Sequence, residues 1–391
     1  MRTFEATHPW LSFQIDLKKV PRAVWLLLGE AATLGERLKK AALPLEEGRL
    51  LDYSALLKGV LANAALDGNG LSEDQVDRLF EGTLTLPSTQ QYLKVEVENL
   101  VKATKQVQDR QIDSNAALDP WRIQLLNAQV LKGLPWSEDI RPGEFRSVRN
   151  SLSADEGVPS GDIPAAMEQL CTWLFSNAFE SEQEEEQVPL GIIRAVMAHL
   201  YLCWIRPFAE GNGRTARLVE HHLLLMAGLP SVAAHQFTIH AAATRASYFR
   251  ELRQSTQAGG NPLPFLATHL RGAVEALRTL WEEVERVQFE GLWRRHLDHL
   301  FQPTTSANGA RQLKLVEGLQ QEQDVVSPGR IPQLTADLAR LYGRLNPKTL
   351  QRDLIQLQEK GLVERVAGGV QVTVRPLHVF RRDPLARDRA S

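Results

Sequence analysis

The stretch RPFAEGNGRTAR, residues 206–217, decides how this chain is interpreted. Apolar residues over 189–204 predict a helix that leads into it, and the pattern over 212–227 predicts a second helix that begins inside it. The segment Gly211-Asn212-Gly213 is therefore expected at a helix N-terminus. Similar periodic patterns recur along most of the sequence, so the chain is expected to be mainly helical.

A glycine-rich helix start of this kind suits phosphate binding. Glycines let the backbone approach a ligand closely, and free N–H groups together with the helix dipole favour negative charge. Arg214 and Arg217 lie one turn apart and offer planar donors to phosphate oxygens. Glu210 could hold Mg²⁺ together with the phosphates. Gly-Asn-Gly alone is also a common helix-start turn, so the interpretation depends on the whole string.

The same string resembles the signature of the Fic family, H-x-F-x-D/E-G-N-G-R-x-x-R. Seven positions match in fixed register: Phe208, Glu210, Gly211, Asn212, Gly213, Arg214 and Arg217. The segment THPW at residues 7–10, the PGEFR segment at 142–146 and the YFREL segment at 248–252 resemble other parts of the family. The resemblance covers residues 1 to about 290.

The resemblance implies a mainly α Fic helical fold with a small flap hairpin. It implies binding of ATP and Mg²⁺ and transfer of AMP to a hydroxyl of a target protein. It assigns the phosphates to Gly211, Asn212, Gly213, Arg214 and Arg217, the metal to Glu210, and a place near the nucleotide to Tyr248. The flap, at about 143–160, would align the target protein by strand-like pairing.

The chain departs from the family at the catalytic position, where Arg206 replaces the histidine. That histidine acts as general base, a contribution of about a hundred to ten thousand-fold. Arginine stays protonated to about pH 12 or above, so Arg206 cannot take its place. His199, His221 and His222 lie near in sequence, but their helical positions do not direct them at the hydroxyl. Two functions stay open: a weak or non-transferring, ATP-binding regulator, which we favour, and an active protein adenylyltransferase with a base from elsewhere.

A second departure concerns the family's inhibitory helix, with the pattern S/T-x-x-x-E-G/N. The corresponding segment is NAALDGN, residues 63–69, in which Asp67 replaces the glutamate and Asn63 the hydroxyl residue. The shorter side chain puts the reach of Asp67 to Arg217 in question. Asp67 is thus either an inhibitory residue or an ordinary turn residue.

The C-terminal part predicts a winged-helix α+β module. Helices are expected over 311–321, 334–341 and 347–357, followed by strands over 362–366 and 370–374 around a glycine turn. The residues expected to contact DNA, on the open face of the third helix, are Lys348, Thr349, Gln351, Arg352 and Gln356. Residues 301–391 hold 14 Lys and Arg against 9 Asp and Glu. This surplus favours DNA at 311–374, with protein docking as the alternative.

Composition sets the outer limits. The 391 residues, 43% hydrophobic and 24% charged, are typical of a globular protein with more than one domain. We expect an N-terminal helical region at 1–110, a Fic core at 111–300, and a winged helix with a basic tail at 301–391. The acidic run over 180–187 is expected to be a loop. Without a signal peptide or a spanning apolar run, the expected location is cytoplasmic, with no membrane partner. Cys171 and Cys203 are expected in the core.

Overall fold

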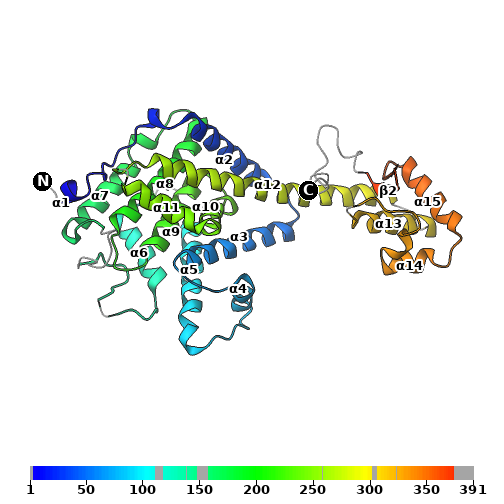
Figure 1. Ribbon diagram of the computed structural model, residues 1–391, viewed down its shortest axis with the longest axis horizontal. Coiled ribbons are helices and arrows are strands. Elements are labelled where there is room, and N and C mark those ends of the chain that lie inside the picture. The colour runs from blue at the N-terminus through cyan, green and yellow to red at the C-terminus, as the bar shows by residue number, and fades with distance from the viewer. Residues whose placement is uncertain are drawn as a thin grey trace. The chain divides into compact units, whose positions relative to one another are not determined.

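The computed structural model describes residues 3–110, 118–137, 139–147, 157–257, 259–301, 306–322 and 324–373. The chain divides into two compact units (Figure 1). Unit 1 consists of Met1–Ala41 and Leu45–Trp281, and unit 2 consists of Ala42–Pro44 and Glu282–Ser391.

Unit 1 is built from helices, which confirms the expectation of a mainly helical fold. Its elements are α1 (Thr3–Thr7), η1 (Leu17–Lys19), α2 (Arg22–Lys40), α3 (Leu45–Leu66), α4 (Glu73–Phe80), η2 (Ser88–Gln90), α5 (Gln91–Arg110), α6 (Pro120–Leu131), η3 (Ser160–Asp162), α7 (Ile163–Leu174), η4 (Asn177–Phe179), α8 (Glu184–Ile205), α9 (Asn212–Met226), α10 (Ser231–Ala243), α11 (Arg245–Gln257) and the first part of α12 (Leu263–Phe301).

Helix α8 forms the centre of unit 1. It is apolar on nearly all sides and packs against α2, α7 and α9. Within the described residues it is the one helix long and apolar enough to cross a membrane, but 83% of that apolar stretch is buried inside the protein. Burial on all sides accounts for its composition. The helix begins at Glu184, so Glu184–Glu186 are helical and not part of a loop, because acidic residues are favourable at a helix N-terminus.

The N-terminal helices bring a distant segment to the start of α9. Helix α3 packs along α10 and α5 and also contacts α9, and α6 packs against both α5 and α9. Leu56, Val60 and Ala64 of α3 share a core cluster with Leu218 of α9. The C-terminal end of α3, where Asp67 follows, is thereby placed beside the arginines of α9.

Unit 2 contains the second part of α12, then α13 (Ala307–Gln320), η5 (Ile331–Gln333), α14 (Ala336–Tyr342), α15 (Pro347–Glu359), β1 (Val363–Val366) and β2 (Gly369–Val372). The two strands are antiparallel, with Val363 opposite Val372 and Val366 opposite Gly369. The expected third helix and the small hairpin after it are therefore both present. Residues 374–391, including the expected basic tail, lie outside the described residues.

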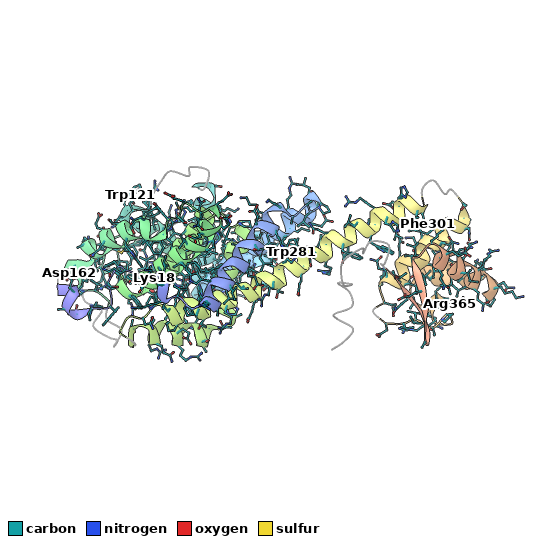
Figure 2. The ribbon with its side chains drawn as sticks, turned by 90° about the horizontal axis from the view of Figure 1, so that it is seen from above. Lys18, Trp121, Asp162, Trp281, Phe301 and Arg365 are labelled. Carbon is teal, nitrogen blue, oxygen red and sulfur yellow. The ribbon has the colours of Figure 1, made fainter. Side chains whose placement is uncertain are left out.

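The division between the units differs from the boundary expected at residue 300. Helix α12 is continuous, and Trp281 and Phe301 both lie on it (Figure 2). Phe289, Trp293, Leu297 and Phe301 belong to the hydrophobic core of unit 2. The unit therefore begins at Glu282, inside a helix, where no turn-forming sequence marks the change.

Candidate functional site

The loop between α8 and α9 has a left-handed residue at each end. Arg206 follows α8 with φ 49° and ψ 63°. A residue with a Cβ pays about 1–2 kcal/mol for this conformation, whereas Gly211, with φ 76° before α9, does not. Such strain persists only where surrounding contacts hold the backbone in place.

Asn212 supplies two of these contacts. Its Oδ1 accepts a hydrogen bond from the backbone N–H of Phe208 at 2.9 Å, and its Nδ2 donates to the Phe208 carbonyl at 2.8 Å. The side chain expected to hold phosphate thus closes the loop. The groups that remain for a ligand are the first-turn N–H groups of α9, which have no partner within the helix.

Asn127 on α6 holds the same loop from outside, and sequence reasoning missed it. It is fully buried. Its Nδ2 donates to the Glu210 carbonyl at 3.0 Å and to Thr215 Oγ1 at 3.3 Å, while its Oδ1 accepts from the N–H of Gly143 at 3.0 Å. The only signal in the sequence is a lone polar residue on the apolar face of a helix.

Arg146 ties both described ends of the flap segment to the strained residue. Its Nε donates to the Arg206 carbonyl at 2.8 Å, and its guanidinium also bonds the Val158 carbonyl. The backbone N–H of Arg146 donates to Pro207, and that of Val158 to Ile205, at 2.9 and 3.1 Å. The central part of the expected flap hairpin, 148–156, lies outside the described residues, and no strand occurs in 143–147 or 157–160.

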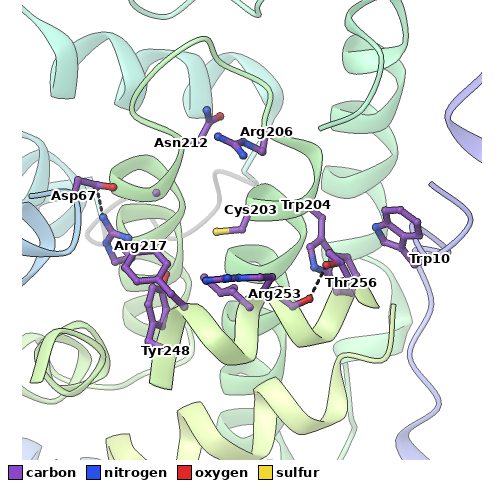
Figure 3. Close-up of a pocket in the computed structure, with 13 residues that line it drawn as sticks. Trp10, Asp67, Cys203, Trp204, Arg206, Asn212, Arg217, Tyr248, Arg253 and Thr256 are labelled. Carbon is purple, nitrogen blue, oxygen red and sulfur yellow. Dashed lines mark hydrogen bonds and ion pairs between the residues drawn. The ribbon is translucent and has the colours of Figure 1, made fainter. Parts of the chain in front are cut away.

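A cavity of about 570 Å³ opens beside the loop (Figure 3). This volume falls within the range of small-molecule sites. Its walls are aromatic and cationic, and they are formed by Trp10, Asp67, Cys203, Trp204, Arg206, Asn212, Gly213, Arg217, Tyr248, Phe249, Leu252, Arg253 and Thr256. Six expected site residues therefore meet there: Asp67, Arg206, Asn212, Gly213, Arg217 and Tyr248. Gly211, Glu210 and Arg214 do not line it.

Arg217 is held by the end of α3. Its side chain is 1% exposed and forms an ion pair with Asp67. Its Nε donates to Asn63 Oδ1 at 2.7 Å, and its guanidinium also donates to the Asn63 carbonyl at 3.1 Å. The shorter carboxylate of Asp67 does reach Arg217, and Asn63 replaces the missing hydroxyl as a hydrogen-bond acceptor.

Arg214 is turned away from the cavity. It pairs with Glu96 of α5, a residue that sequence reasoning missed, and it lies over the ring of Trp136. Its guanidinium is 3.5 Å from Glu210 and its Nε is 3.6 Å from Asp67. The Glu210 side chain remains 44% exposed. A ligand that recruits Arg214 must therefore compete with the buried carboxylate of Glu96.

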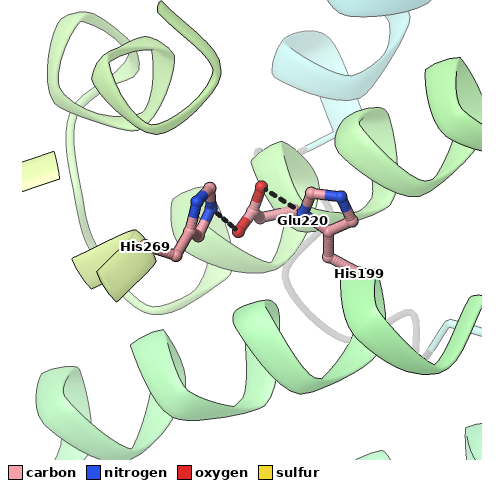
Figure 4. Close-up of side chains that lie close together, drawn as sticks. All are labelled: His199, Glu220 and His269. Atoms are coloured by element: carbon pink, nitrogen blue, oxygen red, sulfur yellow. Dashed lines mark hydrogen bonds and ion pairs between the residues drawn. The ribbon is translucent and has the colours of Figure 1, made fainter. Parts of the chain in front are cut away.

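Behind Tyr248 lies a buried polar cluster (Figure 4). His199 Nδ1 is 2.9 Å from Glu220, His269 Nε2 is 2.8 Å from the other oxygen of Glu220, and His199 Nε2 is 2.8 Å from the Tyr248 hydroxyl. Burial would raise the pKa of Glu220, but the charge and hydrogen bonds of His269 and His199 hold that pKa below its usual value. Burial lowers the pKa of His199. Because His199 is 0% exposed, it cannot reach a substrate hydroxyl.

The two cysteines are poor nucleophiles. Burial raises the pKa of Cys171 and of Cys203 to about 12, so both thiols stay protonated near neutral pH. Cys171 is buried, as expected, and Cys203 is partly buried in the cavity wall.

In unit 2, the residues expected to contact DNA lie on α15. Lys348, Gln351 and Arg352 are exposed and Thr349 is half-buried. Gln356, also expected there, instead accepts hydrogen bonds from Gln312 and Asn308 of α13.

Comparison with known proteins shows what the central segment of the chain resembles. Residues 117–224 match the Fic/DOC family model. This segment is therefore similar to the Fic/DOC family. The chain is 25% identical over 212 residues to a "Protein adenylyltransferase Fic" of Nematostella vectensis, covering 54% of this chain and 45% of that protein. It is 38% identical over 97 residues to the protein of that name from Drosophila mojavensis, covering 24% and 18%. The chain thus spans less than half the length of these curated relatives.

Solved structures share the fold. A Fic family protein from Desulfovibrio desulfuricans G20 superposes with a TM-score of 0.52 at 19% identity, covering 91% of this chain and 97% of that one. Fic-1 (aa134–508) from C. elegans gives a TM-score of 0.56 at 19% identity, covering 67% and 73%. At these identities the likeness concerns the fold alone.

Proposed function

We propose that unit 1 binds ATP with Mg²⁺ in the cavity beside the α8–α9 loop. The observation that supports this most directly is the composition of the cavity walls. They combine Arg206, Arg217 and Arg253 with aromatic rings and the N-terminus of α9, and Asp67 is the only carboxylate among the lining residues. A ligand with an aromatic base and a polyphosphate complements such walls. The relatives named protein adenylyltransferase favour ATP as that ligand.

Bound ATP would replace existing contacts. Arg217 already pairs with Asp67, so the terminal phosphate would have to take over this ion pair. Mg²⁺ would be held by Glu210, whose exposed carboxylate lies near the loop, together with the phosphates. Asp67 acts in this proposal as a restraint on nucleotide binding.

We propose that this chain transfers AMP weakly or not at all. In this proposal it acts as an ATP-binding regulator. Arg206 provides charge but no basic lone pair, and His199 is buried. Loss of a general base costs about a hundred to ten thousand-fold in rate. The alternative is an active adenylyltransferase acting on a target protein at residues 143–160. We propose a cytoplasmic location for either function.

The test is incubation with Mg²⁺ and ATP labelled on the α-phosphate, scored as covalent label on the chain and on lysate proteins. Arg206→His restores a base. Arg206→Gln is the matched control, because it removes the positive charge without adding a base. We expect label only with Arg206→His. Label with the natural chain would contradict the regulator proposal. ATP binding, measured separately by calorimetry, is expected for the natural chain, and its absence would contradict the ATP site.

For unit 2 we propose a winged helix that binds DNA through α15. The exposed side chains of Lys348, Gln351 and Arg352 support this, as does the order of three helices and a hairpin. Exposed Ile355 on the same helix is the feature that favours protein docking instead. We expect duplex binding that weakens between 50 and 200 mM salt, and a smaller salt dependence for the double variant Lys348→Gln, Arg352→Gln. Binding that does not respond to salt would contradict it.

A further inference from the structure

A chain of hydrogen bonds runs from the cavity into the core of unit 1. Tyr248 lines the cavity together with Arg217, with which its hydroxyl interacts, and this hydroxyl is 2.8 Å from His199 Nε2. From His199 the chain continues to Glu220 at 2.9 Å and then to His269 at 2.8 Å (Figure 4). Four helices supply these groups: α8, α9, α11 and α12. The proposed ATP site makes no direct use of His199, Glu220 or His269.

Burial makes the direction of each hydrogen bond definite. His199 is 0%, Glu220 1% and Tyr248 5% exposed, so water cannot substitute for a missing partner. An ionised carboxylate only accepts, so His199 must carry its proton on Nδ1. The lone pair on Nε2 then requires Tyr248 to donate its O–H. Tyr248 is left with acceptor capacity alone, which matches the guanidinium of Arg217, a group that only donates.

A metal ion fits this geometry poorly. The ligand atoms of His199, Glu220 and His269 lie within 4.8 Å of one another, which is near enough by distance alone. Two ligand atoms of a tetrahedral zinc ion lie about 3.3 Å apart, because each bond to zinc is about 2 Å long. The two separations are 2.9 and 2.8 Å. The contacts are therefore hydrogen bonds.

We propose that Glu220 and His199 are positioning residues of the cavity. They fix the Tyr248 hydroxyl as an acceptor and thereby hold the Arg217 guanidinium where it meets an anionic ligand. This inference rests on the proposed ATP site, since it assigns a support to the arginine of that site. If Glu220 only filled space, replacing its oxygens would not change ligand affinity. In this proposal, losing them lowers it.

The test compares Glu220→Met, which keeps the length but removes the acceptors, with Glu220→Gln, whose single oxygen can still accept from His199. The matched control is His221→Gln, at the next residue on α9, which is also buried but lies outside the chain of hydrogen bonds. For Glu220→Met we expect ATP affinity to fall about tenfold. Glu220→Gln should restore most of it, and His221→Gln should leave it unchanged. Circular dichroism verifies that each variant is folded.

A second measurement needs no ligand. Nitrogen NMR of the histidine and arginine side chains in the full chain should show His199 protonated on Nδ1, and Glu220→Met should shift the Arg217 Nε–H signal. If the natural chain fails to bind ATP, the proposed function is wrong, but these signals still decide the positioning. A proton on Nε2 of His199, an Arg217 signal unmoved by Glu220→Met, or displacement of the Nδ1–H by one equivalent of Zn²⁺ would overturn the proposal.

Discussion

Gly59 and His235 are packed so closely that a Cβ on residue 59 would lie 2.1 Å from Nδ1 of His235. Other atoms of the same ring would be 2.7 and 3.0 Å away, so the whole imidazole would have to move. The ring of His221 lies on His235 with centroids 4.3 Å apart. The contact between α3 and α10 positions the end of α3 at the cavity. It therefore requires a glycine at position 59, because any side chain there would collide with His235.

Gly59→Ala should destabilise unit 1 even though alanine favours a helix by about 1 kcal/mol. The clash should outweigh that gain and give a net loss of about 1–3 kcal/mol. Gly29→Ala on α2 is the matched control, because nothing lies within 4 Å of its Cβ position. Gly29→Ala should stabilise by up to about 1 kcal/mol. Urea unfolding of both variants provides the comparison, and equal effects would contradict the packing argument.

Because His221 and His235 are buried together, we expect the protein to lose stability in mild acid. Burial, then the nearby His222, lowers the pKa of His221 to about 4, and burial lowers that of His235 as well. Between about pH 6.5 and 4 the unfolded chain therefore binds protons that the folded chain does not, so stability falls as the pH falls. For His221 alone the loss by pH 4 is roughly 3 kcal/mol.

Hydrogen exchange of α9 and α10 at pH 7, 6 and 5 measures this dependence. His221→Gln should reduce the pH dependence, with the part from His235 remaining, whereas His299→Gln, at an exposed position, should leave it unchanged. A natural chain equally stable at pH 7 and pH 5 would contradict the prediction.

From the ion pair between Asp67 and Arg217 we expect that a variant without the Asp67 charge binds ATP more tightly. Asp67→Asn removes the charge that a terminal phosphate must displace. A charge-assisted hydrogen bond contributes about 1.5–3 kcal/mol, so ATP affinity should rise about tenfold or more. Asp77→Asn on α4, an exposed carboxylate, is the control. Calorimetric titration decides, and an affinity that is unchanged or lower in Asp67→Asn would mean that Asp67 is an ordinary turn residue.

The parts of the site that could be predicted from sequence are those close together in it. Residues 206–217 form one local unit, so their pattern predicted that a helix begins inside it, and the structure places Gly213 and Arg217 in the wall of a cavity. Asp67 was found because a second motif, 63–69, resembles a known pattern. The hairpin of unit 2 followed from alternation around the glycine turn before β2.

The supporting residues could not be found in this way. Glu96 reaches Arg214 across 118 positions of sequence, and Asn127 reaches Glu210 across 83. Glu220 and His269 meet across 49 positions. Each is a buried polar side chain whose partner lies far away in the sequence, so no spacing identifies it. Only the packing of helices decides which carboxylate meets which arginine or imidazole.

In unit 2, the buried carboxylate of Asp353 fixes the position of α15. Its side chain is 0% exposed and accepts from Arg311 Nε at 2.7 Å, from Arg311 again at 3.1 Å, and from the Tyr342 hydroxyl at 2.9 Å. Breaking a buried ion pair leaves a charge uncompensated and costs about 3–5 kcal/mol.

Asp353→Asn should therefore destabilise unit 2 by about 3 kcal/mol or more. The exposed pair between Asp337 and Arg340 on α14 is the matched contrast. Exposed pairs contribute about 0–1 kcal/mol, so Asp337→Asn should have little effect. Hydrogen exchange of α13, α14 and α15 in the full chain separates these effects from those on unit 1. Comparable losses of protection in the two variants would mean that the bond between Asp353 and Arg311 does not determine the position of α15.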